Sequence, residues 1–461
     1  MIAEDPVDDR LVESWRGKAS LNQLAKTMRL NLAEFPVTEI RLGKRFRYEA
    51  ATLEVDRQAL VDLVLHDRRI EEASLELVYP GEKVRVTGIR DIVEPRVKVN
   101  SQAQVFPGTL SAVEPVGEGT THRLSGMAVI ATAVYEGTVR AGLAVQRSAL
   151  LDMWGPGAEV SRFSALIGLV LVMRLKEALS DLDAHQAIQG AELKVAQRLA
   201  ETTVGQHPSH NEVFDLGESE PGLPRIVLMQ GCLTDSHNVH SGVSYYGLPI
   251  RDSLATYLHP NELLDGAMTV TATRAVGHFP ITWDWQNHPL ALELCRRHGK
   301  GINFLGVILE RIQFDTFLGK EVAAHCAAQL AATLGAEGAL VAWIGSGNAF
   351  VELMLTIRAC ERREIKTVLI TYEFGGKDGV DSPLLYYLPE ADAVVSSGSR
   401  DRWVDLPEPD RIVGPYREFS ILSYPGAPVV AANGRLTLDA RDMLIGGVDN
   451  WGGQSWTCKA Y

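Results

Sequence analysis

Up to about residue 150, apolar and polar positions alternate mainly with a period of two, which predicts short strands. We expect such strands within 38–55, around a turn at Gly43-Lys44, and within 82–99 and 128–142. The helical period indicates one helix at 56–67 and a long helix within 170–203. This part of the chain is therefore predicted to be an α+β region.

Two further stretches, an apolar run and a Gly-Pro-Gly tripeptide, each predict a local structure. The apolar run 164–173, bracketed by Arg162 and Arg174, predicts a buried strand or helix, because it is far shorter than the roughly 20 residues that span a bilayer. Gly155-Pro156-Gly157 predicts a turn, since neither a helix nor a central strand can continue through this tripeptide.

From about residue 222 the pattern becomes an alternation of apolar strands and helices. Strands are expected at 226–231, 303–310, 339–345, 366–373 and 391–398, and helices at 320–338 and 349–364. This alternation is typical of a mostly parallel sheet covered on both faces. The predicted fold class is therefore α/β, with an N-terminal α+β region followed by a mostly parallel, doubly wound sheet region.

A stretch rich in Gly, Pro, Ser and acidic residues, 204–225, is the best boundary between these parts. We therefore expect an N-terminal extension at 1–30, an α+β domain at 31–205 and an α/β domain at 222–461. The extension is polar at first and then has an amphipathic helical pattern, around 11–30. It is either an added docking helix or a disordered tail.

Composition and charge narrow the class of partner and the compartment. A net charge of −13, without a basic run, argues against nucleic acid and anionic membranes as partners. The acidic start MIAEDPVDDR is unlike a secretory signal. The five cysteines have no paired or zinc-binding spacing. We expect a cytoplasmic protein, with neither a membrane nor a nucleic acid as partner.

The ends of the predicted parallel strands are the first place to search for a ligand, because ligands collect there in open α/β sheets. These ends bring in Asn348, at the end of 345–348, Glu373, and the stretch 396–398. The sequence GSGNAF at 345–350 could present backbone N–H groups to an anion, although it is more simply a plain strand-to-helix turn.

Two other groups have a chemical and a plain interpretation. Asp235, His237 and His240 could approach one metal ion, but polar loop histidines are the simpler interpretation, and we expect no metal site. Cys232 follows a predicted strand and is either a reactive thiol or a small buried core residue.

Several segments together resemble one family, the alpha (proprotein) subunit of component B of the glycine, sarcosine and betaine reductases. The resemblance runs from about residue 28 to 461. It rests on the joint order of PGEKVRV and DIVEPRVKV within 80–99, FPG at 106–108, VGEGTTHRLSGMAVI at 116–130, DMWGPGAEVSRFS at 152–164, HPNELLDGAMTV at 259–270, WQNHP at 285–289 and RRHGKGINFLGVI at 296–308.

The resemblance implies a chain that is cut internally, before a cysteine that becomes a pyruvoyl group. The carbonyl of that group condenses with the substrate amine, and a selenolate or thiolate of a partner subunit displaces the amine. Counting from Asp265-Gly266-Ala267, the family's Asn-Cys pair falls at about Ala272-Thr273 of this chain. Because no sulfur is present there, we expect no pyruvoyl group and no other cofactor.

Three interpretations of this departure remain. Thr273 is a silent replacement in an uncut chain, which we prefer, or it is cut to a 2-oxobutyryl or free N-terminal Thr enzyme. In the third interpretation, the family's Asn-Cys pair aligns with other residues of this chain, and a neighbour such as Thr269 or Thr271 takes the place of the cysteine. A threonine could form the ester, but elimination at its branched Cβ gives a 2-oxobutyryl group and not a pyruvoyl group.

The candidate site residues follow from this position and from the strand ends. Thr273, Arg274 as a carboxylate-binding group and His278 as an acid or base are the catalytic candidates. Asn348, Glu373 and Trp285, the last in TWDWQNHP, are the substrate-binding candidates. The resemblance implies a subunit that acts with a thiol- or selenol-bearing partner on a small amine or amino-acid-like substrate, in an oligomeric complex. A non-catalytic scaffold is the alternative.

Overall fold

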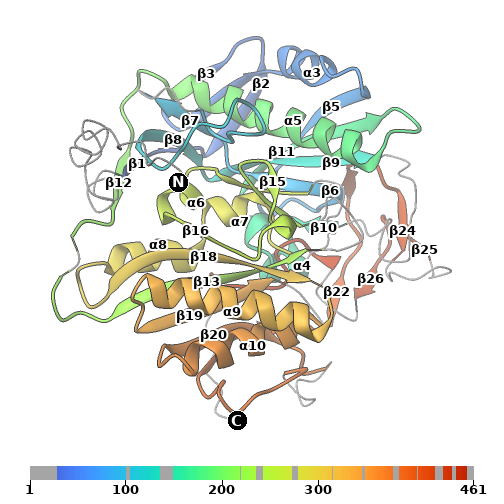
Figure 1. Ribbon diagram of the computed structural model, residues 1–461. Helices are drawn as coiled ribbons and strands as arrows, with labels where there is room; N and C mark the ends of the chain where they lie inside the picture. Colours follow the sequence, from blue (N-terminus) through green and yellow to red (C-terminus); the bar gives the residue numbers. More distant parts are fainter. Residues whose placement is uncertain are drawn as a thin grey trace, which may run out of the picture.

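The computed structural model describes residues 28–99, 104–134, 149–218, 220–234, 242–271, 279–313, 315–344, 348–376, 384–401, 403–420, 429–438 and 443–453. Within these ranges the chain is a mixed α/β protein built on several sheets (Figure 1). The predicted α/β character of the chain is therefore confirmed.

The N-terminal half contains two sheets of four or more described strands. One has the order β12-β1-β8-β7 and the other contains the path β10-β6-β9-β11-β5. Their strands are β1 (Arg29–Pro36), β5 (Ile70–Val78), β6 (Val84–Val93), β7 (Arg96–Val99), β8 (Gly119–Ser125), β9 (Met127–Val134), β10 (Ala149–Asp152), β11 (Ile167–Leu175) and β12 (His210–Asp215). A small sheet, β2-β4-β3, consists of β2 (Glu39–Gly43), β3 (Arg47–Glu49) and β4 (Thr52–Asp56).

Helices α3 (Arg57–Leu65) and α5 (Asp181–Ala200) pack against this half. The Ser180 side chain accepts a hydrogen bond from the backbone of Asp183 and caps α5, and Arg198 lies in its last turn. Both features favour a helix, because they match the free N–H groups and the dipole at its ends. Alanines and leucines of α5 enter the hydrophobic core beneath it.

Two predictions for this half need correction. The tripeptide 155–157 begins the short helix α4 (Gly155–Val160), because a proline in the first helical turn lacks only an N–H that has no helical partner anyway. The predicted helix at 11–30 ends too late, since Arg29 and Leu30 already belong to β1, where they pair with β12. The rest of that helix lies outside the described residues. The apolar run 164–173 falls mainly in strand β11.

The C-terminal half is built on a sheet of six described strands with the order β16-β18-β13-β19-β20-β21. They are β13 (Arg225–Thr234), β16 (Ala255–Leu258), β18 (Asn303–Gln313), β19 (Gly338–Ile344), β20 (Lys366–Glu373) and β21 (Val394–Ser399). All neighbours are parallel except β16, which is antiparallel at one edge. The parallel strands follow the flavodoxin-like order 2-1-3-4-5, whose switch point lies between β13 and β19.

Each face of this sheet belongs to a different hydrophobic cluster. On one face, the sheet packs against α9 (Phe317–Thr333) and α10 (Ala349–Glu361). On the other, it packs against α6 (Pro260–Leu264), α7 (Thr282–Gln286), α8 (Pro289–Arg297) and part of β1. Figure 1 shows α9 and α10 lying in front of this sheet. The face toward α6 and α7 therefore adjoins the N-terminal half.

The end of the chain returns to the N-terminal half. Strand β23 (Arg411–Val413) pairs with β6, and Leu150 of β10 bridges to Leu444. The remaining short elements are β22 (Val404–Leu406), which pairs with β26 (Leu436–Leu438), and β24 (Glu418–Ser420), which pairs with β25 (Val429–Ala431). The domain boundaries remain predictions, but strands from both ends of the chain pair across the predicted division.

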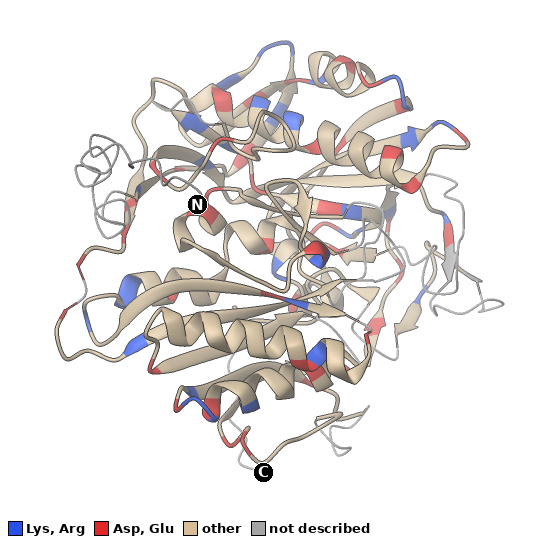
Figure 2. Ribbon diagram, in the orientation of Figure 1, with Lys and Arg blue, Asp and Glu red and all other residues tan. Residues whose placement is uncertain are grey.

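Basic and acidic residues are interspersed over the described elements, and Figure 2 shows no basic stripe along any of them. None of the described helices is both long and apolar enough to cross a membrane.

Candidate functional site

The carboxyl ends of the parallel strands lie at one edge of the C-terminal sheet. Asn348 is exposed there and precedes α10, four residues after β19. Glu373 ends the neighbouring strand β20; it is buried, and its backbone carbonyl accepts a hydrogen bond from the Arg400 amide. Both predicted substrate-binding residues therefore belong to the same sheet edge, although their contact with a substrate stays a prediction.

Strand β17 (Met268–Val270) ends close to this edge. It pairs with β14 (Val243–Tyr245), and the Thr271 amide and hydroxyl both donate to the Gly242 carbonyl, at 3.0 and 3.1 Å. Gly242 lies so close to the end of β13 that an added Cβ would come within 2.8 Å of the Leu233 carbonyl oxygen. The chain thus leaves residue 271 beside the switch point of the sheet.

The three predicted catalytic residues follow directly on this strand. Thr273, Arg274 and His278 lie outside the described residues, so their roles stay predictions. Of the alternative hydroxyl groups, Thr269 is buried within β17 and Thr271 is tied to Gly242. Thr269 is therefore enclosed, and the Thr271 hydroxyl is already engaged in a hydrogen bond.

Two polar side chains, one from α5 and one from α7, hold β17 in place. Gln189 of α5 donates from Nε2 to the Val270 carbonyl at 2.9 Å. The Val270 amide donates to Thr282 Oγ1 at 3.3 Å, and the Thr282 hydroxyl in turn donates to Asp91 of β6. The Thr282 amide also donates to Asp91, at 2.9 Å. A continuous hydrogen-bonded path therefore joins the entrance of 272–278 to a buried carboxyl group.

Asp91 is one of two neighbouring buried carboxyl groups. Burial raises its pKa to about 7, against hydrogen bonds from Thr282 and Ile92 that lower it. Glu192 of α5 is also fully buried, and burial and then the charge of Asp91 raise its pKa well above the usual value. Because two adjacent carboxylates cannot both ionise cheaply, this pair is a site where a proton is held near neutral pH.

A second pair of acidic residues anchors the turn that precedes β17. Glu262 Oε1 accepts from the hydroxyls of Tyr245 and Tyr246, at 2.9 and 2.8 Å. The buried Asp265 accepts from the Gly117 amide at 2.7 Å and from the Thr121 hydroxyl at 2.6 Å, and it pairs with Lys98. The segment HPNELLDGAMTV therefore fixes β17 against β7 and β8, which is a structural role.

A cavity of about 530 Å³ adjoins the same strand. Helix α5 forms one wall, and the turn between β14 and β15 (Leu248–Pro249) forms another. We call it the α5 groove and define it by six of its lining residues: Gln186, Gln189, Gly190, Lys194, Ser244 and Thr271. Its volume falls within the range of small-molecule sites, which is roughly 300–1,000 Å³.

Trp285 lies in the protein core. It is fully buried in the cluster behind the C-terminal sheet and meets Trp451 edge-on, with ring centroids 5.0 Å apart. His288 stacks on Trp451 at 4.0 Å and shares a hydrogen bond with Gln230 of β13. Burial lowers the pKa of His288 to about 3, so this histidine is neutral. Trp285 and Trp451 therefore pack against each other in the core. Contact of Trp285 with a substrate stays a prediction.

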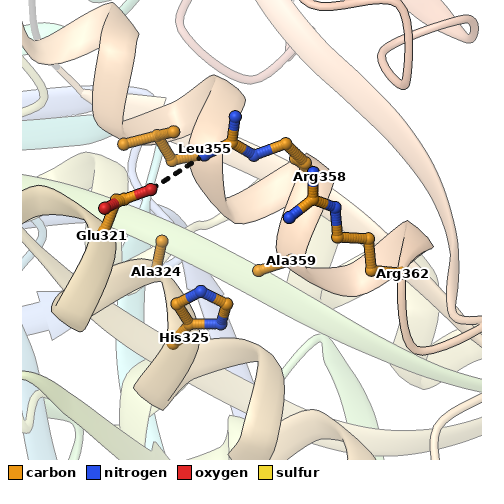
Figure 3. A pocket seen from close by; sticks show the side chains of 7 residues that line it. All are labelled: Glu321, Ala324, His325, Leu355, Arg358, Ala359 and Arg362. Carbon is orange, nitrogen blue, oxygen red and sulfur yellow. Dashed lines mark hydrogen bonds and ion pairs between the residues drawn. The ribbon is translucent and has the colours of Figure 1, made fainter.

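Other chemical groups in the described part of the chain are less suited to a site. Cys232 is fully buried, and burial raises its thiol pKa strongly, which makes it an inert core residue. The described residues contain no cluster of metal-binding side chains, and Asp235, His237 and His240 lie outside them. Figure 3 shows a shallow depression between α9 and α10, beside the Glu321–Arg358 ion pair. It has no enclosed volume.

The sequence carried a signal for the residues that were missed. Asp91 follows Arg90 within the strand pattern of IRDIV, between apolar residues. Glu192 occupies a position four residues after Ile188, on the apolar face of α5. A charged residue at a core position is unusual unless it is paired or functional. The approach of α5 to β17, in contrast, depends on tertiary packing and is not visible in the pattern.

Comparisons with known proteins agree with one another. A family model described as glycine/sarcosine/betaine reductase component B subunits matches residues 28–459. The sarcosine reductase complex component B subunit alpha of Peptoclostridium acidaminophilum is 31% identical over 413 residues, or 87% of this chain and 92% of that protein.

Two further relatives have similar coverage. The betaine reductase complex component B subunit alpha of the same organism is 32% identical over 397 residues, 84% of this chain and 88% of the relative. The glycine reductase complex component B subunits alpha and beta of Acetoanaerobium sticklandii are 31% identical over 400 residues, which cover 84% of this chain and 89% of the relative. No solved structure matches the chain.

Proposed function

Because the chain belongs to the family of glycine/sarcosine/betaine reductase component B subunits, we propose that it is a subunit of a reductase complex that cleaves a C–N bond in a small amine-bearing acid. A thiol or selenol on a partner subunit attacks the α-carbon, the C–N bond breaks and the amine leaves. The observation that carries this proposal is the match over residues 28–459, which includes both halves and the strand that ends beside the sheet switch point.

We further propose that this chain works without a pyruvoyl group. Ala272-Thr273 offers a hydroxyl where the chemistry of pyruvoyl formation requires a thiol or an unbranched hydroxyl. Cys232 cannot substitute, because it is enclosed in the core and its thiol pKa is raised. The residues present therefore do not fit this group, and no step is assigned to it.

In this proposal the chain positions the backbone beside the reaction site and supplies a proton there. Thr271, Gln189 and Thr282 fix the backbone at the end of β17 beside the sheet edge. The buried pair Asp91 and Glu192 holds a proton close to that backbone. Arg274, and Asn348 and Glu373 at the sheet edge, remain candidate substrate-contacting residues in this proposal.

Intact-mass spectrometry of the purified chain tests the absence of processing. We expect a single species near 50.4 kDa, and reaction with hydrazine should leave its mass unchanged. Thr273→Ala should likewise be a single uncut species, and it should retain the activity of the unaltered chain. Two fragments dividing near residue 272, or a hydrazine adduct on one of them, would establish self-processing and contradict the uncut form.

The reductase function itself requires a separate test. The chain is combined with its thiol or selenol partner subunit and a dithiol reductant, and amine release from glycine, sarcosine and betaine is measured. We expect release that depends on this chain and on the partner. If the complex forms but Arg274→Ala and Asp91→Asn both leave amine release unchanged, the chain is a scaffold and its catalytic role is wrong.

A further inference from the structure

We propose that the α5 groove binds the carboxylate-bearing substrate, with Lys194 receiving the carboxylate; this inference rests on the proposed reductase function and names a binding site for it. The groove is the largest of the cavities described above, at about 530 Å³, and it is polar along its α5 wall. Thr271 belongs to its lining and is also the last described residue before 272–278. The groove therefore adjoins the position where the family pattern places the reacting group.

The wall opposite α5 is built by a close contact between two turns. An added Cβ at Gly108 would come within 2.1 Å of the Tyr246 carbonyl oxygen, and one at Gly247 would come within 2.7 Å of the Gly108 carbonyl. Phe106 and Tyr246 have positive φ angles of 56° and 49°, which are uncommon for non-glycine residues. Backbone strain of this kind persists only where surrounding packing enforces it, so this wall is a fixed surface.

The charges along the groove favour an anionic ligand. Two acidic residues also line it, and each has a basic partner: Asp67 pairs with Arg69 at 2.7 Å, and Asp252 pairs with Arg251 at 3.2 Å. Arg69 bonds to Gln186 as well. Lys194 has no ion pair or hydrogen bond with the described residues, and it projects from α5 toward the same space. The charge of Lys194 acts on Asp67, but Asp67 is already paired with Arg69, so the ammonium group can still attract a carboxylate. Amide and hydroxyl groups of Gln186, Ser244 and Thr271 lie in the same lining.

The groove is large enough to hold both the substrate and an attacking group of a partner subunit. It is much larger than an acid of the size of glycine or betaine, so such a substrate would leave room beside it. A thiol or selenol of a partner subunit must approach the α-carbon of the bound acid, and an open groove allows this approach. The substrate class we assign is therefore a small acid whose carboxylate faces Lys194.

Gly190 gives a direct way to block the groove. It lies inside α5 and lines the groove, and an added Cβ there would meet nothing within 4 Å. Gly190→Trp therefore fills the groove without a clash at Cβ, and replacing glycine also favours the helix. Lys194→Met keeps the length of the side chain and removes the charge. Matched controls are Gln329→Trp on the exposed surface of α9 and Lys300→Met on an exposed turn.

Titration calorimetry on the full chain, with glycine, sarcosine and betaine as probes, measures binding. We expect Gly190→Trp to abolish binding and Lys194→Met to weaken it about tenfold or more, while both controls bind as the unaltered chain does. Acetate should compete and methylamine should not. Binding that survives in both groove variants, or the absence of binding by all three probes, overturns the assignment.

The outcome of the reductase assay separates this inference from the proposed function. If the probes bind in the groove and no amine is released with any partner, the groove is a carboxylate site and the reductase function is wrong. If amine is released at the normal rate by Gly190→Trp and Lys194→Met, the function stands and the groove does not bind the substrate. Circular dichroism of both variants excludes misfolding as the cause of lost binding.

Discussion

At the scale of single residues, the buried carboxyl groups make the stability of the chain depend on pH. The pKa of Asp91 rises from a usual value of 3.8 to about 7 on burial, so the folded chain binds a proton that the unfolded chain has released. This stabilisation is present below about pH 4 and is lost as the pH rises toward 7. The same direction holds for Glu192 and for Glu310, whose pKa is raised to about 8.

We predict that Asp91→Asn reduces this pH dependence. From pH 5 to pH 8 the free energy of unfolding falls in the unaltered chain. In Asp91→Asn this decrease should be smaller by about 1 kcal/mol or more, because the amide carries no charge to bury. Urea unfolding at both pH values measures the difference. The exposed Glu114→Gln is the control and should follow the unaltered chain. An equal loss in Asp91→Asn and the unaltered chain would show that Asp91 does not titrate in this range.

At the scale of elements, the short strand β17 depends on a buried ion pair outside itself. Asp265 precedes β17 and pairs with Lys98 of β7, and both side chains are almost fully buried. We predict that Asp265→Asn destabilises the chain by about 3–5 kcal/mol, because the ammonium group of Lys98 is left buried without a counter-charge. Chemical denaturation measures the loss, and the exposed Glu293→Gln, which breaks a surface pair with Arg297, should change stability by about 0.5 kcal/mol or less.

A double variant identifies the cause of this loss. Lys98→Met combined with Asp265→Asn removes both charges, so its destabilisation should be smaller than the sum of the two single variants. Simple additivity would mean that the hydrogen bonds to Gly117 and Thr121, and not the ion pair, anchor the strand.

The elements themselves were largely predictable, and the site was only partly so. Strands β13, β18, β19 and β20, with helices α9 and α10, follow from local periodicity, because each is long and strongly apolar on at least one face. The path from Val270 through Thr282 to Asp91 joins residues 91, 270 and 282, which no local pattern connects. Strand β12, within the predicted boundary 204–225, was missed because its pairing with β1 decides its conformation.

At the scale of the whole molecule, the two halves are interlocked. Val413 and Ile445 belong to the same hydrophobic cluster as Val84 and Val86 of β6, and Leu30 of β1 packs in the cluster behind the C-terminal sheet. Strands and core residues therefore cross the predicted boundary in both directions, and the domain boundaries themselves stay predictions.

Arg85 of β6 is the residue that ties the returning end of the chain to the N-terminal half. Its guanidinium group is fully buried, pairs with Asp152 at 2.7 Å and donates to the carbonyls of Pro407, Ala432 and Gly434, at 2.8–2.9 Å. We predict that Arg85→Met destabilises the chain by about 3–5 kcal/mol, since Asp152 and three carbonyls lose their buried partner. Limited proteolysis should then cut first after residue 403, faster than in the exposed control Arg297→Met. Protection equal to that of the control would show that the hydrophobic contacts alone hold the returning segment.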